Sequence, residues 1–183
     1  MDELSYAVVA YLPGRLGRFV DHLRQRVNPA FACWQAHVTL LPPRLLRGTP
    51  EESLAKIRQT CGPLEPFEVA VDGWSTFWPV NGVVYLTLGK GSERLVQLHD
   101  ALNCDGLAQQ EVYPYIPHIT LAQQLDETGT QKVLAEVASE WTRYDGEVSF
   151  RVESLTLVRQ MPDNRWADLA PVPLGILLAP SRK

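Results

Sequence analysis

The chain has 183 residues, and 45% of them are hydrophobic, so it can bury the core of one domain and disorder is excluded as its main state. Its formal charge of -4 and charged fraction of 21% argue against a long duplex DNA partner, which would require clustered Lys and Arg. Residues 1–60 hold eight Lys/Arg against five Asp/Glu, giving +3, and the remainder therefore carries -7. An anion-attracting surface should thus involve the N-terminal third.

The chain carries no pattern typical of secretion or membrane insertion. Its first residues are acidic, and the short apolar run that follows ends at Pro13, too soon for a signal peptide or a membrane span. The three cysteines include no C-x-x-C pair, which favours reduced thiols over a disulfide framework. We therefore expect a cytoplasmic protein with no membrane partner.

The first third of the chain has the pattern strand, helix, strand, helix. An apolar run over residues 6–12 predicts a strand, and helical spacing of apolar residues predicts a helix over 15–27. Residues 34–41 again resemble a strand, which should end at Pro42-Pro43. A helix start of composition T-P-E-E then predicts a helix over residues 49–61.

The remaining two thirds continue with alternating strands and helices. Aromatic and β-branched residues predict two strands, over 67–78 and 83–88, joined by a tight hairpin turn at Asn81-Gly82. The other predicted elements are a helix over 92–103, a strand over 115–122, a helix over 130–141, one long or two short strands over 147–160, and a last strand pair over 164–178.

Two of the four histidines begin the same tetrad, in His37-Val38-Thr39-Leu40 and in His118-Ile119-Thr120-Leu121. The two motifs are far apart in the chain, and each lies on a predicted strand between two predicted helices. A duplicated strand-helix unit would explain this arrangement. We therefore predict an α+β protein in which residues 1–183 form a single domain of two similar lobes.

The spacing within each motif indicates its chemistry. On a strand, residues i and i+2 project to the same face, so each motif presents an imidazole and a hydroxyl together. One neutral imidazole can take a proton from water while the other, protonated, gives a proton to the oxygen that leaves phosphorus. The threonine hydroxyls can bind the non-bridging oxygens as negative charge gathers on them. We predict His37 and His118 as catalytic residues and Thr39 and Thr120 as substrate-binding residues.

Other ligand types have less support. The chain contains no H-x-x-x-H, H-E-x-x-H or paired-cysteine spacing, so we predict neither a metal site nor a cofactor. His22 and His99 lie on predicted amphipathic helices, where solvated imidazoles are the simpler interpretation. The five tryptophans share no spacing and fit core or lobe-interface positions.

The two motifs, a proline directly before the second, and the overall chain length resemble the 2H phosphoesterase superfamily, in particular its 2'-5' RNA ligase-like and RNA 2',3'-cyclic phosphodiesterase members. The resemblance extends over nearly the whole chain. It implies two antiparallel sheets that face a central cleft with helices outside, and hydrolysis of a 2',3'-cyclic phosphate to a 2'-phosphate without a cofactor. It also implies that His37 protonates the leaving oxygen and that His118 activates water.

One position departs from that pattern. Ligase-like members often have an arginine after the second motif, where this chain has Gln123. Arg44 or Arg47, which follow the first motif, could neutralise the phosphate instead, and both fit solvated loop charges equally well.

Two tyrosines are further candidates for substrate contact. Tyr115 fits core packing, unless a bulge at Pro117 turns it toward the cleft. Tyr85 shares a strand face with Thr87, and either could contact a base if that face lines the cleft.

The sequence thus predicts a monomeric hydrolase that opens a cyclic phosphate on a small nucleotide or an RNA terminus. Two alternatives remain. The same residues could join or cleave 2'-5' linkages in RNA, or the chain could bind nucleotides or RNA without turnover. The pair of His-Thr motifs argues against a pure binder, because binding does not require two groups of matched pKa.

Overall fold

The computed structural model describes residues 4–162 and 165–176, which form β-strands, α-helices and two one-turn 3-10 helices. The strands are β1 (Tyr6–Tyr11), β2 (His37–Arg44), β3 (Phe67–Thr76), β4 (Val84–Leu88), β5 (His118–Ala122), β6 (Ser149–Val152), β7 (Ser154–Gln160) and β8 (Trp166–Pro173). The α-helices are α1 (Gly14–Val27), α2 (Pro50–Cys61), α3 (Ser92–Leu102) and α4 (Glu127–Arg143), and the 3-10 helices are Pro29–Phe31 and Asp105–Leu107.

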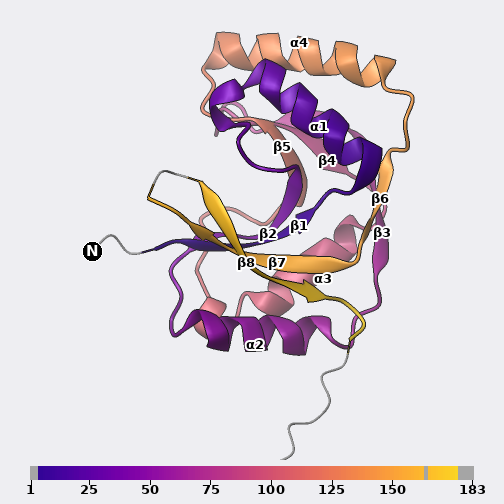
Figure 1. The fold of residues 1–183 in the computed structure, drawn as a ribbon. Helices are drawn as coiled ribbons and strands as arrows, with labels where there is room; N and C mark the ends of the chain where they lie inside the picture. Colours follow the sequence, from indigo (N-terminus) through magenta and orange to yellow (C-terminus); the bar gives the residue numbers. More distant parts are fainter. Residues whose placement is uncertain (1–3, 163–164, 177–183) are drawn as a thin grey trace, which may run out of the picture.

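The strands form two four-stranded sheets, in the orders β2-β1-β7-β8 and β5-β4-β3-β6 (Figure 1). Every pairing in both sheets is antiparallel. The motif strands β2 and β5 each lie at one edge of a sheet, and they contact one another. The predicted α+β fold with two antiparallel sheets is confirmed.

A pair of helices covers each sheet, and one helix of each pair comes from the part of the chain that precedes the other motif strand. Helices α1 and α4 pack against the sheet that contains β5, whereas α2 and α3 pack against the sheet that contains β2. Figure 1 shows these pairs on opposite sides of the molecule. Helix α1 follows β1 in sequence but contacts β5, and α3 precedes β5 but contacts β2. Each motif strand therefore packs against the helix that precedes the other motif strand in sequence.

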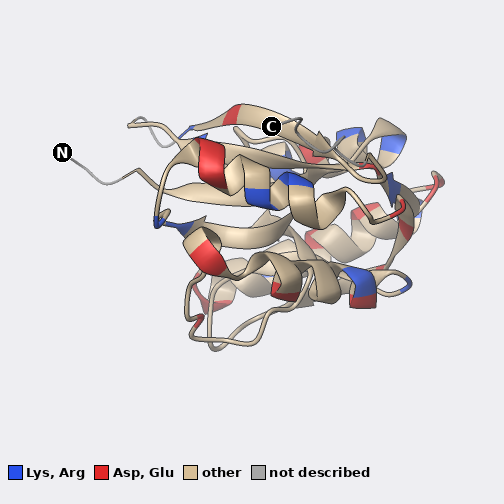
Figure 2. Ribbon diagram, turned by 90° about the horizontal axis from the view of Figure 1, so that it is seen from below, with Lys and Arg blue, Asp and Glu red and all other residues tan. Residues whose placement is uncertain are grey.

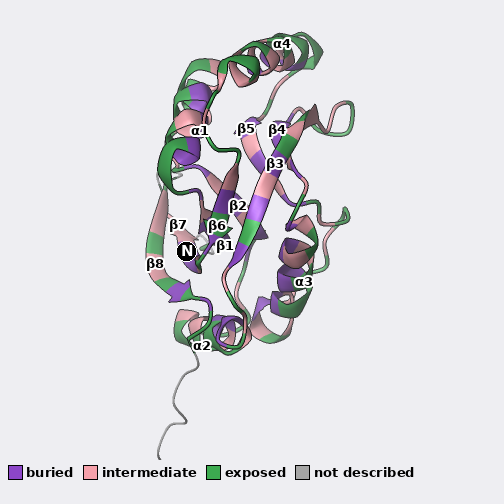
Figure 3. Cartoon of the chain, turned by 90° about the vertical axis from the view of Figure 1, so that its right-hand side faces the viewer, coloured by how far each residue is buried: buried purple, intermediate pink, exposed green. Residues whose placement is uncertain are grey.

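Burial alternates along both motif strands as the sequence predicts. Val38, Leu40, Ile119 and Leu121 are at most 2% exposed and lie in the main core, while the histidines and threonines between them are partly exposed. Figure 3 shows burial over the whole fold, with buried residues along the strands and exposed residues on the outward faces of the helices. The main core includes residues of both sheets, so the two halves pack as one body.

Several predicted strand ends were wrong. Strand β2 does not stop at Pro42-Pro43 but continues to Arg44. It is an edge strand, and proline is tolerated there because one side of the strand has no partner that needs its N–H. The strand predicted over 115–122 begins only at His118. The pair predicted over 164–178 is the single strand β8, also an edge strand, and residues 164, 177 and 178 lie outside the described residues.

The β3–β4 hairpin forms as predicted, but its connection is not a tight turn at Asn81-Gly82. Residues 77–83 join the strands, and Gly82 does not have the positive φ that a type I′ turn requires. This glycine instead permits a close approach of two chain segments. A Cβ at Gly82 would lie 1.9 Å from the carbonyl oxygen of Leu125, whose own N–H donates to the Gly82 carbonyl at 3.0 Å.

Acidic and basic residues are interspersed on the helices seen in Figure 2.

The three cysteines are free thiols, with Cys61 buried and Cys33 exposed. Among the described residues, no helix combines the length and the hydropathy needed to cross a membrane.

Candidate active site

The two His-x-Thr motifs meet at one pocket between the sheets. Thr39 on β2 and Thr120 on β5 both line this pocket together with His37, and its volume is about 330 Å³. His118, the first residue of β5, is not among the residues that line it. The charge of His118 acts on His37, so the second imidazole lies within electrostatic range of the first. The structure therefore brings three of the four motif residues to one pocket and places His118 close to His37, although the two motifs lie in different thirds of the chain.

The two imidazoles are held in the same way. Each ring donates a hydrogen bond through its Nδ1 to the carbonyl oxygen two residues earlier, at 2.7 Å in both cases: His37 to Gln35 and His118 to Ile116. A carbonyl can only accept, so the proton of the neutral ring lies on Nδ1. Nε2 is then the nitrogen available to take or give a proton in each half of the site.

Burial disfavours the protonated form of both imidazoles. Desolvation lowers the pKa of His37 from 6.5 to about 4, and the positive charges of Arg24 and His118 act in the same direction. Desolvation also lowers the pKa of His118. Both rings are therefore neutral at pH 7 in the free protein, and a negatively charged ligand is needed to favour protonation of one of them.

The pocket extends from His37 over an aromatic surface. Trp34 and Trp166 line it and form an edge-to-face pair, with ring centroids 5.7 Å apart. Trp34 also lies beside the His37 ring, at a centroid separation of 6.5 Å. We expected the tryptophans in the core or between the lobes. Trp166 packs against a small core cluster, as expected, and both tryptophans also line the pocket. Their place in the pocket was not visible in the sequence, because Trp34 comes from the loop before β2 and Trp166 from the distant edge strand β8.

Aromatic side chains also surround His118. Tyr85 on β4 lies opposite Thr120 in the β4–β5 ladder, and its ring centroid is 5.1 Å from that of His118. Phe77 stacks on Tyr85 at 4.2 Å and meets His118 edge-on at 5.1 Å. Tyr85 therefore packs against the second imidazole, which leaves it a candidate for substrate contact.

Arg24 is a pocket residue that the sequence analysis did not single out. It lies on α1, is 5% exposed and lines the same pocket as His37 and Thr39. A signal for it is present in the sequence, because Leu16, Val20 and Arg24 follow one another at helical spacing on the buried face of α1. A charged residue on an apolar helix face is uncommon and indicates a specific partner.

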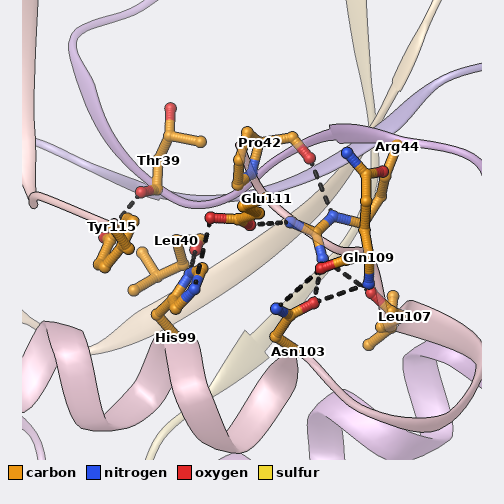
Figure 4. Close-up of polar contacts among 10 residues, drawn as sticks. All are labelled: Thr39, Leu40, Pro42, Arg44, His99, Asn103, Leu107, Gln109, Glu111 and Tyr115. Carbon is orange, nitrogen blue, oxygen red and sulfur yellow. Dashed lines mark hydrogen bonds and ion pairs between the residues drawn. The ribbon is translucent and has the colours of Figure 1, made fainter. Parts of the chain in front are cut away.

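Arg44 does not supply charge to the cleft, contrary to one interpretation of the sequence. Its guanidinium is buried behind β2 and forms an ion pair with Glu111 at 2.7 Å (Figure 4). It also donates to Asn103 Oδ1 and to the Leu107 carbonyl, each at 2.7 Å. Arg47, the other candidate, is exposed beside α2 and does not line the pocket. The two interpretations as phosphate ligands are therefore wrong.

Tyr115 supports the motif strand from the side opposite the cleft. Its hydroxyl donates to the Thr39 carbonyl at 2.8 Å, while the Thr39 side chain points away from it (Figure 4). The Tyr115 ring stacks on His99 at 4.0 Å, and His99 donates through Nδ1 to the Leu40 carbonyl at 2.7 Å. His99 is thus buried rather than solvated as we expected, and Tyr115 occupies a packing position. Both hold the backbone of β2.

Within the described residues, no group of three or more His, Cys, Asp or Glu side chains is arranged to hold a metal ion. The polar groups of the residues that line the pocket are imidazole, hydroxyl, amide, indole and guanidinium groups. This inventory suits an anionic, hydrogen-bond-accepting ligand.

Structures similar to this one include E. coli LigT, solved with 3'-AMP and with NADP+. The 3'-AMP complex has a TM-score of 0.64 and 20% sequence identity, over 93% of this chain and 97% of LigT. The NADP+ complex has a TM-score of 0.61 and 18% identity, over 95% of this chain and 99% of LigT. At these identities the likeness shows a shared fold.

Sequence comparison identifies the family. A protein of Bacillus licheniformis whose name describes it as a phosphoesterase is 25% identical over 164 residues, which are 89% of this chain and 94% of the relative. A protein of Geobacillus kaustophilus with the same description is also 25% identical, over 89% of this chain and 92% of the relative. The sequence model of the 2'-5' RNA ligase superfamily matches residues 12–164. The chain therefore belongs to this superfamily of 2H phosphoesterases.

Proposed function

We propose that the chain is a metal-independent phosphodiesterase that hydrolyses a 2',3'-cyclic phosphate on a small nucleotide or an RNA end. The observation that carries the proposal is the matched fixation of the two imidazoles. Each Nδ1–H is bound to a carbonyl two residues earlier, which leaves the Nε2 atom of each ring for proton transfer. A site for binding alone does not require this symmetry.

The placement of the four motif residues supports the following reaction. One imidazole takes a proton from water, whose oxygen forms a bond to phosphorus, and the other imidazole gives a proton to the ribose 3' oxygen as its bond to phosphorus breaks. The product is a 2'-phosphate. Thr39 and Thr120 donate to the non-bridging oxygens, whose charge is greatest in the five-coordinate transition state. The family resemblance assigns the acid to His37 and the base to His118.

A small nucleotide fits the dimensions of the site. The pocket of about 330 Å³ lies at the lower end of the range for small-molecule sites. LigT, which shares the fold, has been solved with 3'-AMP, NADP+ and ATP. Both motifs belong to one chain, so the proposed active unit is the monomer.

A second candidate is cleavage or formation of a 2'-5' linkage by the same residues. The aromatic side chains lie on both sides of the motifs, with Trp34 beside His37 and the Phe77–Tyr85 pair beside His118. A linear diester carries a group on each side of its phosphate, and both groups could contact aromatic rings here. Products from 2'-5' and 2',3'-cyclic substrates would distinguish the two activities.

The decisive experiment measures hydrolysis of nucleoside 2',3'-cyclic phosphates in EDTA from pH 5 to 9. His37→Ala and His118→Ala should each lower kcat/KM by about 10² to 10⁴, because each removes a proton-transfer group. His22→Ala, at an exposed position of α1, is the control and should retain activity. Turnover that depends on an added metal, or that survives loss of both cleft histidines, would contradict the proposal. A binding role would then be favoured if the protein still bound nucleotides.

A further inference from the structure

Arg24 is a buried cation at the edge of the pocket. Its residue is 5% exposed, and it is the one Lys or Arg among the described residues that line the cavity. Its guanidinium donates to two backbone carbonyls of the loop before β2, through Nη1 to Trp34 at 3.0 Å and through Nη2 to Phe31 at 3.4 Å. These bonds hold the guanidinium beside the approach to His37.

Across the described part of the chain, no carboxylate lies within ion-pair distance of this guanidinium. Asp21, one turn earlier on α1, acts on it at longer range but accepts the Ala36 N–H at 2.7 Å instead. Arg44 provides the contrast, since its equally buried guanidinium is paired with Glu111. Burying a charge without a counter-ion is costly, so a site of this kind favours an incoming anion.

The chemistry of guanidinium specifies the anion. It has five N–H donors in a plane, and two carbonyls do not use all of them. The planar fork matches the oxygens of phosphate, and hydrogen bonds between two charged groups are stronger than those between neutral groups. His37, Thr39 and Thr120 line the same pocket, so an anion held there also meets the motif residues.

We propose that Arg24 is the phosphate-binding cation of this cleft, which holds a non-bridging oxygen of the substrate next to His37. This inference rests on the proposed function for the identity of the substrate. It gives the cleft the positive charge that Gln123, Arg44 and Arg47 do not provide. Arg24 lies on α1, whereas the arginine that ligase-like members often have follows the second motif, at the position of Gln123 in this chain.

Binding of an anion at this site also favours protonation of the His37 ring. The charged and titratable groups near its ring are Arg24 from α1, His118 from β5 and Tyr11 from β1, whose hydroxyl donates to Asp168 on β8. The charge of Arg24 lowers the pKa of His37 in the free protein. A bound phosphate compensates that charge, so His37 can hold the proton that an acid must give. Substrate binding and the protonation of His37 are therefore coupled.

Binding of inorganic phosphate, measured by calorimetry at pH 7, tests this assignment in the full chain. Arg24→Gln should weaken binding by about tenfold to a hundredfold, the loss of a hydrogen bond between charged groups. Arg24→Lys retains the charge and should lose less. Arg18→Gln, at an exposed position of the same helix, is the matched control and should bind like the wild type. Arg24→Gln that binds phosphate as tightly as the wild type would overturn the inference.

A purely structural role for Arg24 gives a different pattern. If the residue only fastens the loop before β2, Arg24→Lys and Arg24→Gln should weaken phosphate binding equally, and this result would also refute the assignment. If Arg24→Gln does not fold, the Arg24 Nε–H signal of the wild-type protein is followed by NMR during a phosphate titration. A shift of this signal supports the inference, and an unchanged signal overturns it.

The same measurements separate this inference from the proposed function. Phosphate binding that depends on Arg24, together with no hydrolysis of any cyclic or 2'-5' substrate, would refute the function and support the anion site. Hydrolysis with the same kcat/KM in Arg24→Gln as in the wild type would refute the anion site and support the function.

Discussion

Replacing His37 with glutamine should reduce the loss of folding stability that this protein undergoes as the pH falls from 7 to 4.5. The folded chain holds the pKa of His37 at about 4, against an ordinary value of 6.5. Below pH 6.5 the unfolded chain takes up a proton at this position, but the folded chain does not do so until the pH approaches 4. Since the unfolded state binds more protons in this window, the free energy of unfolding falls as the pH falls. Above pH 6.5 the penalty is absent.

The size of the effect follows from the shift. Each unit of pKa difference corresponds to about 1.4 kcal/mol, so the penalty could reach about 3 kcal/mol near pH 4. At pH 4.5, and allowing for the partial exposure of the ring, we expect a penalty of about 2 kcal/mol. Urea unfolding followed by tryptophan fluorescence at pH 7 and at pH 4.5 gives the loss of stability for each variant. This loss should be smaller in His37→Gln than in the wild type by the whole of that penalty.

Two further measurements make this prediction specific. His22→Gln retains His37 and should therefore retain the full wild-type loss. Titration of the His37 ring by NMR should give a midpoint well below 6.5. Equal losses in His37→Gln and the wild type, or a midpoint near 6.5, would refute the argument that burial and Arg24 keep this imidazole neutral.

Three other substitutions test the supports of the site. Glu111→Ala leaves the buried guanidinium of Arg44 without its ion-pair partner and should destabilise the fold by about 3 kcal/mol in urea unfolding, whereas an unchanged midpoint would contradict the pairing. Tyr115→Phe removes the hydrogen bond to the Thr39 carbonyl and should cost about 1 kcal/mol, or about 2 to 4 °C in Tm, with a lower kcat; a kcat equal to that of the wild type would show that this bond does not position Thr39. Gly82→Ala places a Cβ against a backbone carbonyl and should lower Tm by more than Tyr115→Phe does, and the reverse order would argue against a close approach of the two segments.

The two motif strands, and the faces on which their side chains lie, were predictable from the sequence. Alternation along His37–Val38–Thr39–Leu40 and along the second motif correctly predicted which side chains are buried, because neighbouring residues of a strand face opposite sides. The start of α2 was also encoded locally. Thr49 and Glu52 form a reciprocal capping box, which depends only on residues three positions apart.

What those buried faces contact depends on tertiary packing and was not predictable from the sequence. Hydrophobic periodicity reports that a face is covered but does not identify the covering element, so it could not reveal that α1 packs on β5 or that α3 packs on β2. The same limit explains the two arginines. Arg44 and Arg24 are both basic residues of the N-terminal third, and only packing directed one behind β2 toward Glu111 and the other into the pocket beside His37. The charge at the cleft was thus set by long-range packing, which the order of residues along the chain does not display.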